Sequence, residues 1–285
     1  MNATTHEFDV EARSADGTAL RGRLWAADNP RGVVVVAHGL GEHGGVYAET
    51  AAMIGASAGV DVVAFDFRGH GRSAGKRGVV GRHEDFGGDL QAAIGWARLE
   101  RPGRPVFALG HSNGGLIALR AALERPDDFA GLILSSPTLR LIDVVPRWKW
   151  LAGRVLRRVG PGVTLSTDLR IEELTSDPTA LESRPLDPLR HGRVNAELFF
   201  GMIESGARVA ALAPTLRVPT LLLLGGSDPI VDHRAALAAF EAFGTADKTA
   251  IVYPEMVHEP LCEIGRERVH ADLLNWLAPR LDRGN

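Results

Sequence analysis

Cysteine is nearly absent from this sequence, since Cys262 is the single one among 285 residues. That excludes a disulfide within the chain and a zinc site built from cysteines. Long apolar runs are missing too, because none approaches the roughly 18 residues of a membrane-spanning helix. The first residues lack the apolar core of a secretory signal. These absences predict a soluble cytoplasmic protein.

A large excess of charge of one sign is also missing. The formal net charge is -3, which argues against nucleic acid as a partner. Hydrophobic residues make up 45% and charged residues 24% of the chain, as in ordinary globular proteins, and this excludes extensive disorder. The length predicts one large domain or two small ones.

What the sequence does contain is a regular alternation of strand and helix patterns. Two extended segments, residues 6–13 and 19–26, flank Asp16-Gly17, a pair typical of hairpin turns. The valine run at 33–37 is typical of a strand buried on both faces of a parallel sheet. The alternation predicts a doubly wound, mostly parallel α/β sheet with right-handed crossovers. Further strands are predicted at 62–67, 106–109, 131–134, 220–224 and 248–253, and helices at 85–100, 114–124, 233–243 and 266–281.

The alternation is interrupted between residues 140 and 213. This segment contains no pattern of a buried strand, and several short helices are predicted there. The strand pattern resumes afterwards. We therefore interpret residues 140–213 as an insertion, and residues 1–139 and 214–285 as the two parts of one core.

The segment Gly110-His111-Ser112-Asn113-Gly114 fits the pattern G-x-S-x-G and lies between a predicted strand and a predicted helix. In that context the serine occupies a strained turn, and the flanking glycines let the backbone bend so that the hydroxyl stands clear of the sheet. The alternative is a glycine-rich turn that contains a serine by chance. Ser112 is the candidate nucleophile.

A serine nucleophile needs a base beside it, and the base needs an acid to orient it. In this fold the three residues follow in the order Ser, Asp, His, the last two each after a strand. Asp228 and His258 meet both conditions, with His258 as general base and Asp228 as the orienting acid. Three rivals are less well placed, because each lies at the start of a helix or inside one: Asp232, His233 and His270.

An oxyanion hole needs two backbone N–H groups directed at one point. The first is expected from Asn113, which directly follows the candidate nucleophile at the start of a helix. The second is expected from Leu40, in the loop after the valine strand. Glycine on either side of Leu40 lets that loop approach the reacting atoms closely.

The same loop supports a different class of function. Residues 39–44 read G-x-G-x-x-G after a strand, and Asp66 lies 66 − 44 = 22 residues beyond the last glycine. This is the pattern of an NAD(P)-binding oxidoreductase. Against it, a hairpin precedes the strand, and Ser112, Asp228 and His258 would have no role. A catalytically silent binding protein on the same fold is a third alternative.

Metal binding is not predicted. His38 and His43 lie five residues apart, but they are on a loop and not on a helix with the HExxH pattern. Histidines hydrogen-bonded beside a cleft are the simpler interpretation. Asp66 and Arg68 are interpreted in the same way, as polar turn residues that tie loops together beneath the site.

Five segments of the sequence are informative in combination: HGLGEHGGVY at 38–47, FDFRGHGRSAGKRG at 65–78, GHSNGG at 110–115, GGSDPIVD at 225–232 and YPEMVHEP at 253–260. Together they resemble the monoacylglycerol lipase and lysophospholipase family of α/β-hydrolases. The interval from Asp228 to His258, 30 residues, agrees with that family. The segment DPLRHGRVNAELF at 187–199 adds to the resemblance, which extends from about residue 20 to residue 280.

The resemblance implies a serine hydrolase that cleaves carboxylic esters of lipids without a metal or a cofactor. It also implies that residues 140–213 form a helical cap over the site. Some apolar residues of the cap are expected to hold the acyl chain, and others to pack the cap onto the core. The residues predicted to bind substrate are Glu42, Trp148, Trp150, Phe199, Phe200 and Met202.

An amphipathic cap can also touch a membrane or micelle surface. Arginines interleave with apolar residues near the start of the insertion, which suits an anionic lipid surface. A solvated basic helix face is the alternative. The arginines are Arg147, Arg154, Arg157 and Arg158.

Two departures from the family pattern concern the head group of the substrate. Monoacylglycerol lipases often carry an arginine just before the tyrosine of the first loop, where this sequence has Val46. They often carry a second histidine three residues after the catalytic one, where this sequence has Leu261. The resemblance as a whole makes a monoacylglycerol the first prediction for the substrate, and these two departures make a lysophospholipid or a broad range of carboxylic esters the alternative.

Overall fold

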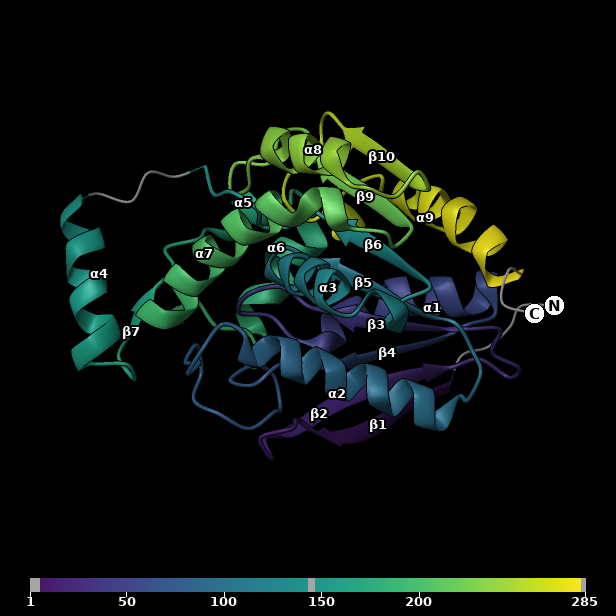
Figure 1. Ribbon diagram of the computed structural model, residues 1–285, viewed down its shortest axis with the longest axis horizontal. Helices are drawn as coiled ribbons and strands as arrows, with labels where there is room; N and C mark the ends of the chain where they lie inside the picture. The colour runs from purple at the N-terminus through teal and green to yellow at the C-terminus, as the bar shows by residue number, and fades with distance from the viewer. Residues whose placement is uncertain (1–5, 143–146, 283–285) are drawn as a thin grey trace.

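The computed structural model describes residues 6–142 and 147–282. Eight strands form one central sheet (Figure 1). In spatial order they are β1 (His6–Arg13), β2 (Ala19–Ala26), β4 (Asp61–Phe65), β3 (Val33–Ala37), β5 (Val106–His111), β6 (Gly131–Ser135), β9 (Thr220–Gly225) and β10 (Lys248–Tyr253). The predicted α/β class is confirmed.

One strand of the sheet, β2, runs opposite to the other seven. The β1–β2 hairpin pairs antiparallel within itself and against β4, and every other neighbouring pair is parallel. In a parallel sheet the carboxyl ends of the strands meet at one edge, where α/β proteins place their ligands. The loops after β3, β5, β6, β9 and β10 therefore gather at one edge of the sheet.

Helices cover both faces of the sheet (Figure 1). The alternation along β3 explains this, because Val34 and Val36 pack on one face while Val33 and Val35 pack on the other, and all four are buried. One face is covered by α1 (Ala48–Ala58) and α9 (Arg266–Leu281). The opposite face is covered by α2 (Asp85–Glu100), α3 (Asn113–Glu124) and α8 (His233–Ala242).

The insertion follows β6 and holds elements that were only partly predicted. The longest is α7 (Ala196–Leu212), which packs on α3 and is longer than the short helices expected. Two short antiparallel strands, β7 (Thr164–Ser166) and β8 (Arg193–Asn195), were not predicted. Along the chain these join α4 (Arg147–Val159), α5 (Ile171–Leu174), α6 (Pro178–Ser183) and the 3-10 turn η3 (Arg184–Leu186). In Figure 1, α4 lies at one end of the molecule, beyond α7. The domain boundaries at 139/140 and 213/214 stay a prediction.

Element ends agree with the expected ones to within about two residues, and the differences have local causes. Strand β4 ends at Phe65, two residues before the expected end at residue 67. The next residue, Asp66, lies just before a turn, and its carboxylate accepts the amides of Gly44 and Arg72. The remaining 3-10 turns are η1 (Gly44–Tyr47), η2 (Pro126–Asp128), η4 (Ala213–Thr215) and η5 (Pro260–Cys262). Among the residues described, no helix is both long enough and apolar enough to cross a bilayer.

Candidate active site

Ser112 lies on a sharp turn between the end of β5 and the start of α3. Its backbone has φ +52° and ψ −121°, a conformation that side chains rarely adopt. Glycines are needed beside it: a Cβ on Gly110 would lie 2.7 Å from the Cα of Gly115, and a Cβ on Gly114 would lie 2.0 Å from the carbonyl oxygen of Ala37. The half-buried Ser112 hydroxyl therefore stands at the carboxyl edge of the sheet, at the start of a helix.

The structure brings Ser112, His258 and Asp228 together in one chain of hydrogen bonds. His258 Nε2 lies 3.0 Å from Ser112 Oγ, and His258 Nδ1 lies 2.7 Å from Asp228 Oδ2. The other carboxylate oxygen of Asp228 accepts the amides of Ile230 at 2.8 Å and Val231 at 3.0 Å. Both oxygens of Asp228 are thus occupied, which holds the carboxylate in the orientation that fixes the histidine ring.

Charge and burial set the protonation states of this chain. Burial alone would lower the pKa of His258, but the hydrogen bond to Asp228 and the charge of that carboxylate raise the pKa above its ordinary value. Burial alone would raise the pKa of Asp228, but the bond from His258 and the two backbone amides hold it below its ordinary value. A proton taken up by His258 is therefore stabilised by an ionised neighbour.

The rival residues lie elsewhere. Asp232 caps the start of α8, where it accepts two backbone amides and pairs with Arg140. His233 is the first residue of α8. His270 is buried within α9, with its Nε2 3.3 Å from the hydroxyl of Thr50. None of the three takes part in the hydrogen-bond chain of Ser112.

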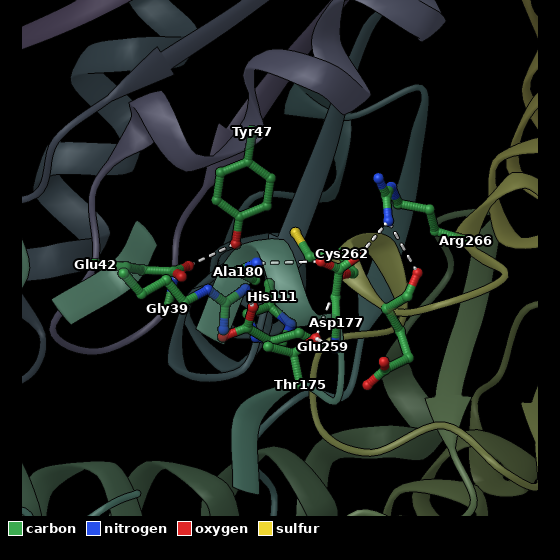
Figure 2. Close-up of polar contacts among 12 residues, drawn as sticks. Gly39, Glu42, Tyr47, His111, Thr175, Asp177, Ala180, Glu259, Cys262 and Arg266 are labelled. Atoms are coloured by element: carbon green, nitrogen blue, oxygen red, sulfur yellow. Dashed lines mark hydrogen bonds and ion pairs between the residues drawn. The ribbon is translucent and has the colours of Figure 1, made fainter. Parts of the chain in front are cut away.

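The two candidate oxyanion donors lie on the loop after β3 and at the first residue of α3. Across the described chain, no hydrogen bond outside the helices and strands uses the amide N–H of Leu40 or of Asn113. The loop after β3 is stabilised by Glu42, whose Oε1 accepts both the Gly39 amide and the Tyr47 hydroxyl at 2.6 Å (Figure 2). The assignment of Leu40 and Asn113 to the oxyanion hole stays a prediction.

Sequence reasoning missed several polar neighbours of the site. The hydroxyl of Thr138 lies 3.1 Å from Ser112 Oγ. A signal for it existed, because Thr138 follows β6 at the same edge of the sheet as the other site loops. His83 Nε2 lies 2.9 Å from Asn113 Oδ1, and the ring of His111 packs 4.9 Å from that of His258. Nothing in the local sequence pattern indicated the contact of His83.

A second group of ionised residues lies beside the hydrogen-bond chain. Glu42 and Glu259 are both buried, and they meet two arginines of the insertion, Arg184 and Arg190. Burial and the neighbouring Glu42 raise the pKa of Glu259, whereas the interactions with His111 and Arg190 outweigh burial and lower the pKa of Glu42. A cavity of about 10 Å³ lies here, lined by Glu42, Val46, Tyr47, His111, Glu259, Leu261 and Cys262.

The residues predicted to hold substrate occupy different environments. Trp150, Phe199 and Phe200 form an aromatic cluster, with ring centroids 4.8 to 6.1 Å apart, between α4 and α7. Met202 is buried in the core, and Trp148 is 69% exposed. Contact of these five residues and of Glu42 with a substrate stays a prediction.

The dinucleotide alternative does not fit the loop that suggested it. The segment of residues 39–44 leads into the short turn η1, and α1 begins only at Ala48, whereas a pyrophosphate-binding helix begins within the glycine-rich segment itself. Asp66, which would hold a ribose, accepts the amides of Gly44 at 2.7 Å and Arg72 at 2.8 Å. A Cβ on Gly41 would lie 2.1 Å from the carbonyl oxygen of His191, so the insertion already covers the loop.

The loop histidines that raised the question of a metal are used within the protein. His38 accepts the Phe67 amide at 2.9 Å, and His43 pairs with Asp187 at 2.8 Å. Arg68 pairs with Asp89 of α2 and with Asp16 of the β1–β2 turn, each at 2.6 Å, and so ties its own turn to both. Among the residues that the structure describes, no three His, Cys, Asp or Glu side chains are grouped so that they could hold a metal ion.

A sheet of this topology, with a serine on the sharp turn after β5 and an acid and a histidine after its last two strands, defines an α/β-hydrolase. Comparison with known proteins agrees with this class. The chain belongs to the family described as Hydrolase_4, serine aminopeptidase, S33, which matches residues 28–265.

Individual relatives resemble the chain over most of its length. Human monoglyceride lipase is 35% identical over an alignment of 276 residues, which covers 94% of this chain and 89% of the human protein. Monoacylglycerol lipase of Mycolicibacterium smegmatis is 32% identical over an alignment of 260 residues, which covers 90% of this chain and 92% of that protein. The crystal structure of Paleococcus ferrophilus monoacylglycerol lipase superimposes with a TM-score of 0.81 at 31% identity, covering 96% of this chain and 99% of that one.

Proposed function

We propose that the chain hydrolyses carboxylic esters of lipids, with a monoacylglycerol as its substrate and Ser112 as its nucleophile. The observation that carries the proposal is the unbroken hydrogen-bond chain from Ser112 through His258 to Asp228. Similarity to the human and mycobacterial monoacylglycerol lipases supports the substrate. The family description, which mentions an aminopeptidase, makes amide cleavage an activity to be tested alongside.

Acylation is the first half of the reaction. Ser112 Oγ attacks the ester carbonyl carbon while His258 Nε2 takes the hydroxyl proton. The carbonyl oxygen becomes an oxyanion, which the amides of Leu40 and Asn113 hold. The bond to the alcohol then breaks, and the imidazolium of His258 gives its proton to the leaving oxygen. An acyl-enzyme ester on Ser112 and a free alcohol result.

Deacylation repeats these steps with water. His258 takes a proton from a water molecule, and the hydroxide formed attacks the acyl carbon under the same two amides. The tetrahedral intermediate collapses, and Ser112 Oγ regains its proton from His258 as the carboxylic acid leaves. Asp228 stays ionised throughout and stabilises the imidazolium in both halves.

A second candidate substrate class is favoured by one observation. Val46 and Leu261 place apolar side chains near Glu42, at positions where many monoacylglycerol lipases carry an arginine and a histidine. Fewer polar groups are thus available beside Glu42 to select a glycerol head group. A lysophospholipase or a carboxylesterase of broad range, acting through the same Ser112, is therefore the alternative.

We also infer that α4 contacts a lipid surface. Its apolar residues at positions 148, 151, 155 and 159 follow helical spacing and are 51% to 76% exposed. The opposite face packs on α7 through Trp150 and through Arg157, which pairs with Glu197 at 2.6 Å. The exposed stripe is flanked by cations, which suit anionic lipid head groups: Arg147, Lys149, Arg154 and Arg158.

The test combines one variant with one substrate panel. Ser112→Ala should lose at least about 10³-fold in kcat on a nitrophenyl ester and should no longer react with a fluorophosphonate. Ser183→Ala, which changes an exposed serine on α6, is the matched control and should keep both properties. The panel compares monoacylglycerols of graded chain length with lysophospholipids, simple esters and a peptide amide. Full activity of Ser112→Ala would contradict the proposal.

A further inference from the structure

One buried carboxylate, that of Glu42, accepts hydrogen bonds from two groups of the loop that carries Leu40. Glu42 is 4% exposed, and its Oε1 accepts the Gly39 amide and the Tyr47 hydroxyl, both at 2.6 Å (Figure 2). Because Gly39 directly precedes Leu40, the contact to Glu42 fixes the peptide next to the candidate oxyanion donor. A buried carboxylate without a cation would be costly, so the loop depends on what neutralises Glu42.

The cation that meets Glu42 comes from the insertion. Arg190 Nη2 donates to Glu42 Oε2 at 3.2 Å, and the Arg190 side chain is 14% exposed. The sequence gives no hint of this contact, since the two positions are 148 residues apart. The second oxygen of Glu42 is thus occupied by Arg190 while the first holds the loop.

Arg190 belongs to a segment that is fastened to the same loop at two further points. We name residues 184–191 the strap. The Asp187 carboxylate lies 2.8 Å from Nε2 of His43, and the His191 amide donates to the carbonyl of Gly41 at 2.8 Å. The strap therefore lies along the loop, and Arg190 reaches Glu42 from a backbone that is itself held in place.

The strap also reaches the loop of the candidate base. Glu259, the residue after His258, is buried, and its Oε1 lies 3.8 Å from Arg190 Nη2. Arg184, at the start of the strap, pairs with the other oxygen of Glu259. Arg190 is thus an ionic partner of two buried carboxylates, one on each of the loops that must hold the reacting groups.

We propose that Arg190 is a positioning residue for hydrolysis, which sets the oxyanion loop through Glu42. The inference rests on the proposed function, since it takes Leu40 as an oxyanion donor. Arg190 acts on the geometry of the loop, not on the substrate. Its removal leaves the Glu42 carboxylate buried without its cation, so that Glu42 turns toward water and releases the Gly39 amide.

The principal experiment replaces Arg190 by leucine. Arg190→Leu should lower kcat and the rate of fluorophosphonate reaction at Ser112 by about 10-fold or more, with KM within about 2-fold, because an oxyanion contact acts in the transition state. Arg101→Leu is the matched control at the amino end of the sheet. Arg101 Nε lies 2.6 Å from buried Asp61, whose carboxylate accepts the Ala27 amide at 2.9 Å. That variant should lose stability but keep kcat.

Two further variants separate positioning from a merely structural role. Glu42→Gln keeps an acceptor for the Gly39 amide but needs no cation, so adding Arg190→Leu to it should change kcat by less than about 2-fold. Arg190→Lys keeps the charge and should recover part of the kcat lost in Arg190→Leu.

The inference is overturned if Arg190→Leu keeps its kcat, if it changes KM alone, or if its effect is the same in the Glu42→Gln background. If Arg190→Leu does not fold, the kcat of Arg190→Lys is compared with that of the native protein instead, because lysine is the milder change. Loss of activity in Ser112→Ala together with native kcat in Arg190→Leu would remove this inference and leave the proposed function standing.

Discussion

The Nδ1 atom of His258 lies 2.7 Å from Oδ2 of Asp228, and the carboxylate is held there by the amides of Ile230 and Val231. With Nδ1 so engaged, Nε2 is the nitrogen that faces Ser112, at 3.0 Å from its hydroxyl. The two contacts assign opposite tasks to the two ring nitrogens. This arrangement is the basis of the first two predictions.

Asp228→Asn should lower kcat by about 10³- to 10⁴-fold, because an amide at this position no longer stabilises the imidazolium and can hold the wrong tautomer. Asp232→Asn is the control, since Asp232 caps α8 and is not bonded to His258. It should keep kcat within about 2-fold and lower the free energy of unfolding by at most about 1 kcal/mol. Steady-state kinetics and urea unfolding measure both. A larger loss of kcat in Asp232→Asn would contradict the assignment.

The pH dependence of kcat/KM follows from the raised pKa of His258. His258 accepts a proton only when neutral, so activity falls as the pH decreases through its pKa, which lies above the ordinary histidine value of about 6.5. Burial and the charge of His258 lower the pKa of His111 to about 4, so His111 stays neutral in that range. A pH–rate profile should therefore show an acid limb of slope one.

Asp228→Asn supplies the control for that profile. Without the carboxylate, the main causes that raise the pKa of His258 are gone, so the acid limb of the residual activity should move to lower pH. A limb of slope two above pH 5, or one that stays in place in Asp228→Asn, would contradict this description.

Gly41→Ala should destabilise the protein more than Gly17→Ala. Both glycines have left-handed backbones, with φ +75° and +86°, and alanine costs about 1 kcal/mol in such a conformation. A Cβ on Gly41 would in addition lie 2.1 Å from the His191 carbonyl, whereas a Cβ on Gly17 meets no described atom within 4 Å. Urea unfolding should show a loss of more than about 2 kcal/mol for Gly41→Ala. Equal losses would mean that the strap moves away freely.

Contact of α4 with lipid should depend on its exposed apolar stripe. Replacement of Trp148 and Leu151 by serine should weaken binding to anionic vesicles by about 10-fold or more, since each buried side chain contributes about 1.5 to 3 kcal/mol. Hydrolysis of a short soluble ester should stay within about 2-fold of native. Leu99→Ser, at an exposed apolar residue of α2, is the control for vesicle flotation. Unchanged flotation of the double variant would contradict the contact.

The sheet and the hydrogen-bond chain were predictable because their signals are local. The four valines of β3 are buried on both faces of the sheet, and they are consecutive in the sequence. A short segment is therefore enough to predict this strand. Ser112 and Asp228 each follow such a strand, and the rule that strand ends meet at one edge places them side by side. Periodicity and chain order therefore suffice for these elements.

The charged cluster was not predictable in this way. Arg190 and Glu42 are far apart in the sequence, and neither lies on a strand or helix whose period would indicate its direction. Thr138 had a usable signal at the end of β6, but an unpatterned threonine is not distinctive without its distance to Ser112. The length of α7 was underestimated for a similar reason, since burial on α3 stabilises it beyond what its own sequence pattern indicates.

Because the strap bonds to Glu42 and His43, residues 140–213 cannot be exchanged as a whole for the corresponding segment of another hydrolase. A chimera that takes the whole of residues 140–213 from another hydrolase would leave Glu42 and His43 facing a foreign segment, and would lose turnover even if it folded. Recombination should instead leave 184–191 native and exchange the chain on either side of it. Residues of α4 and α7 can therefore be substituted to change the substrate range. Residues of the strap that contact the loop of Leu40 cannot be changed without affecting that loop.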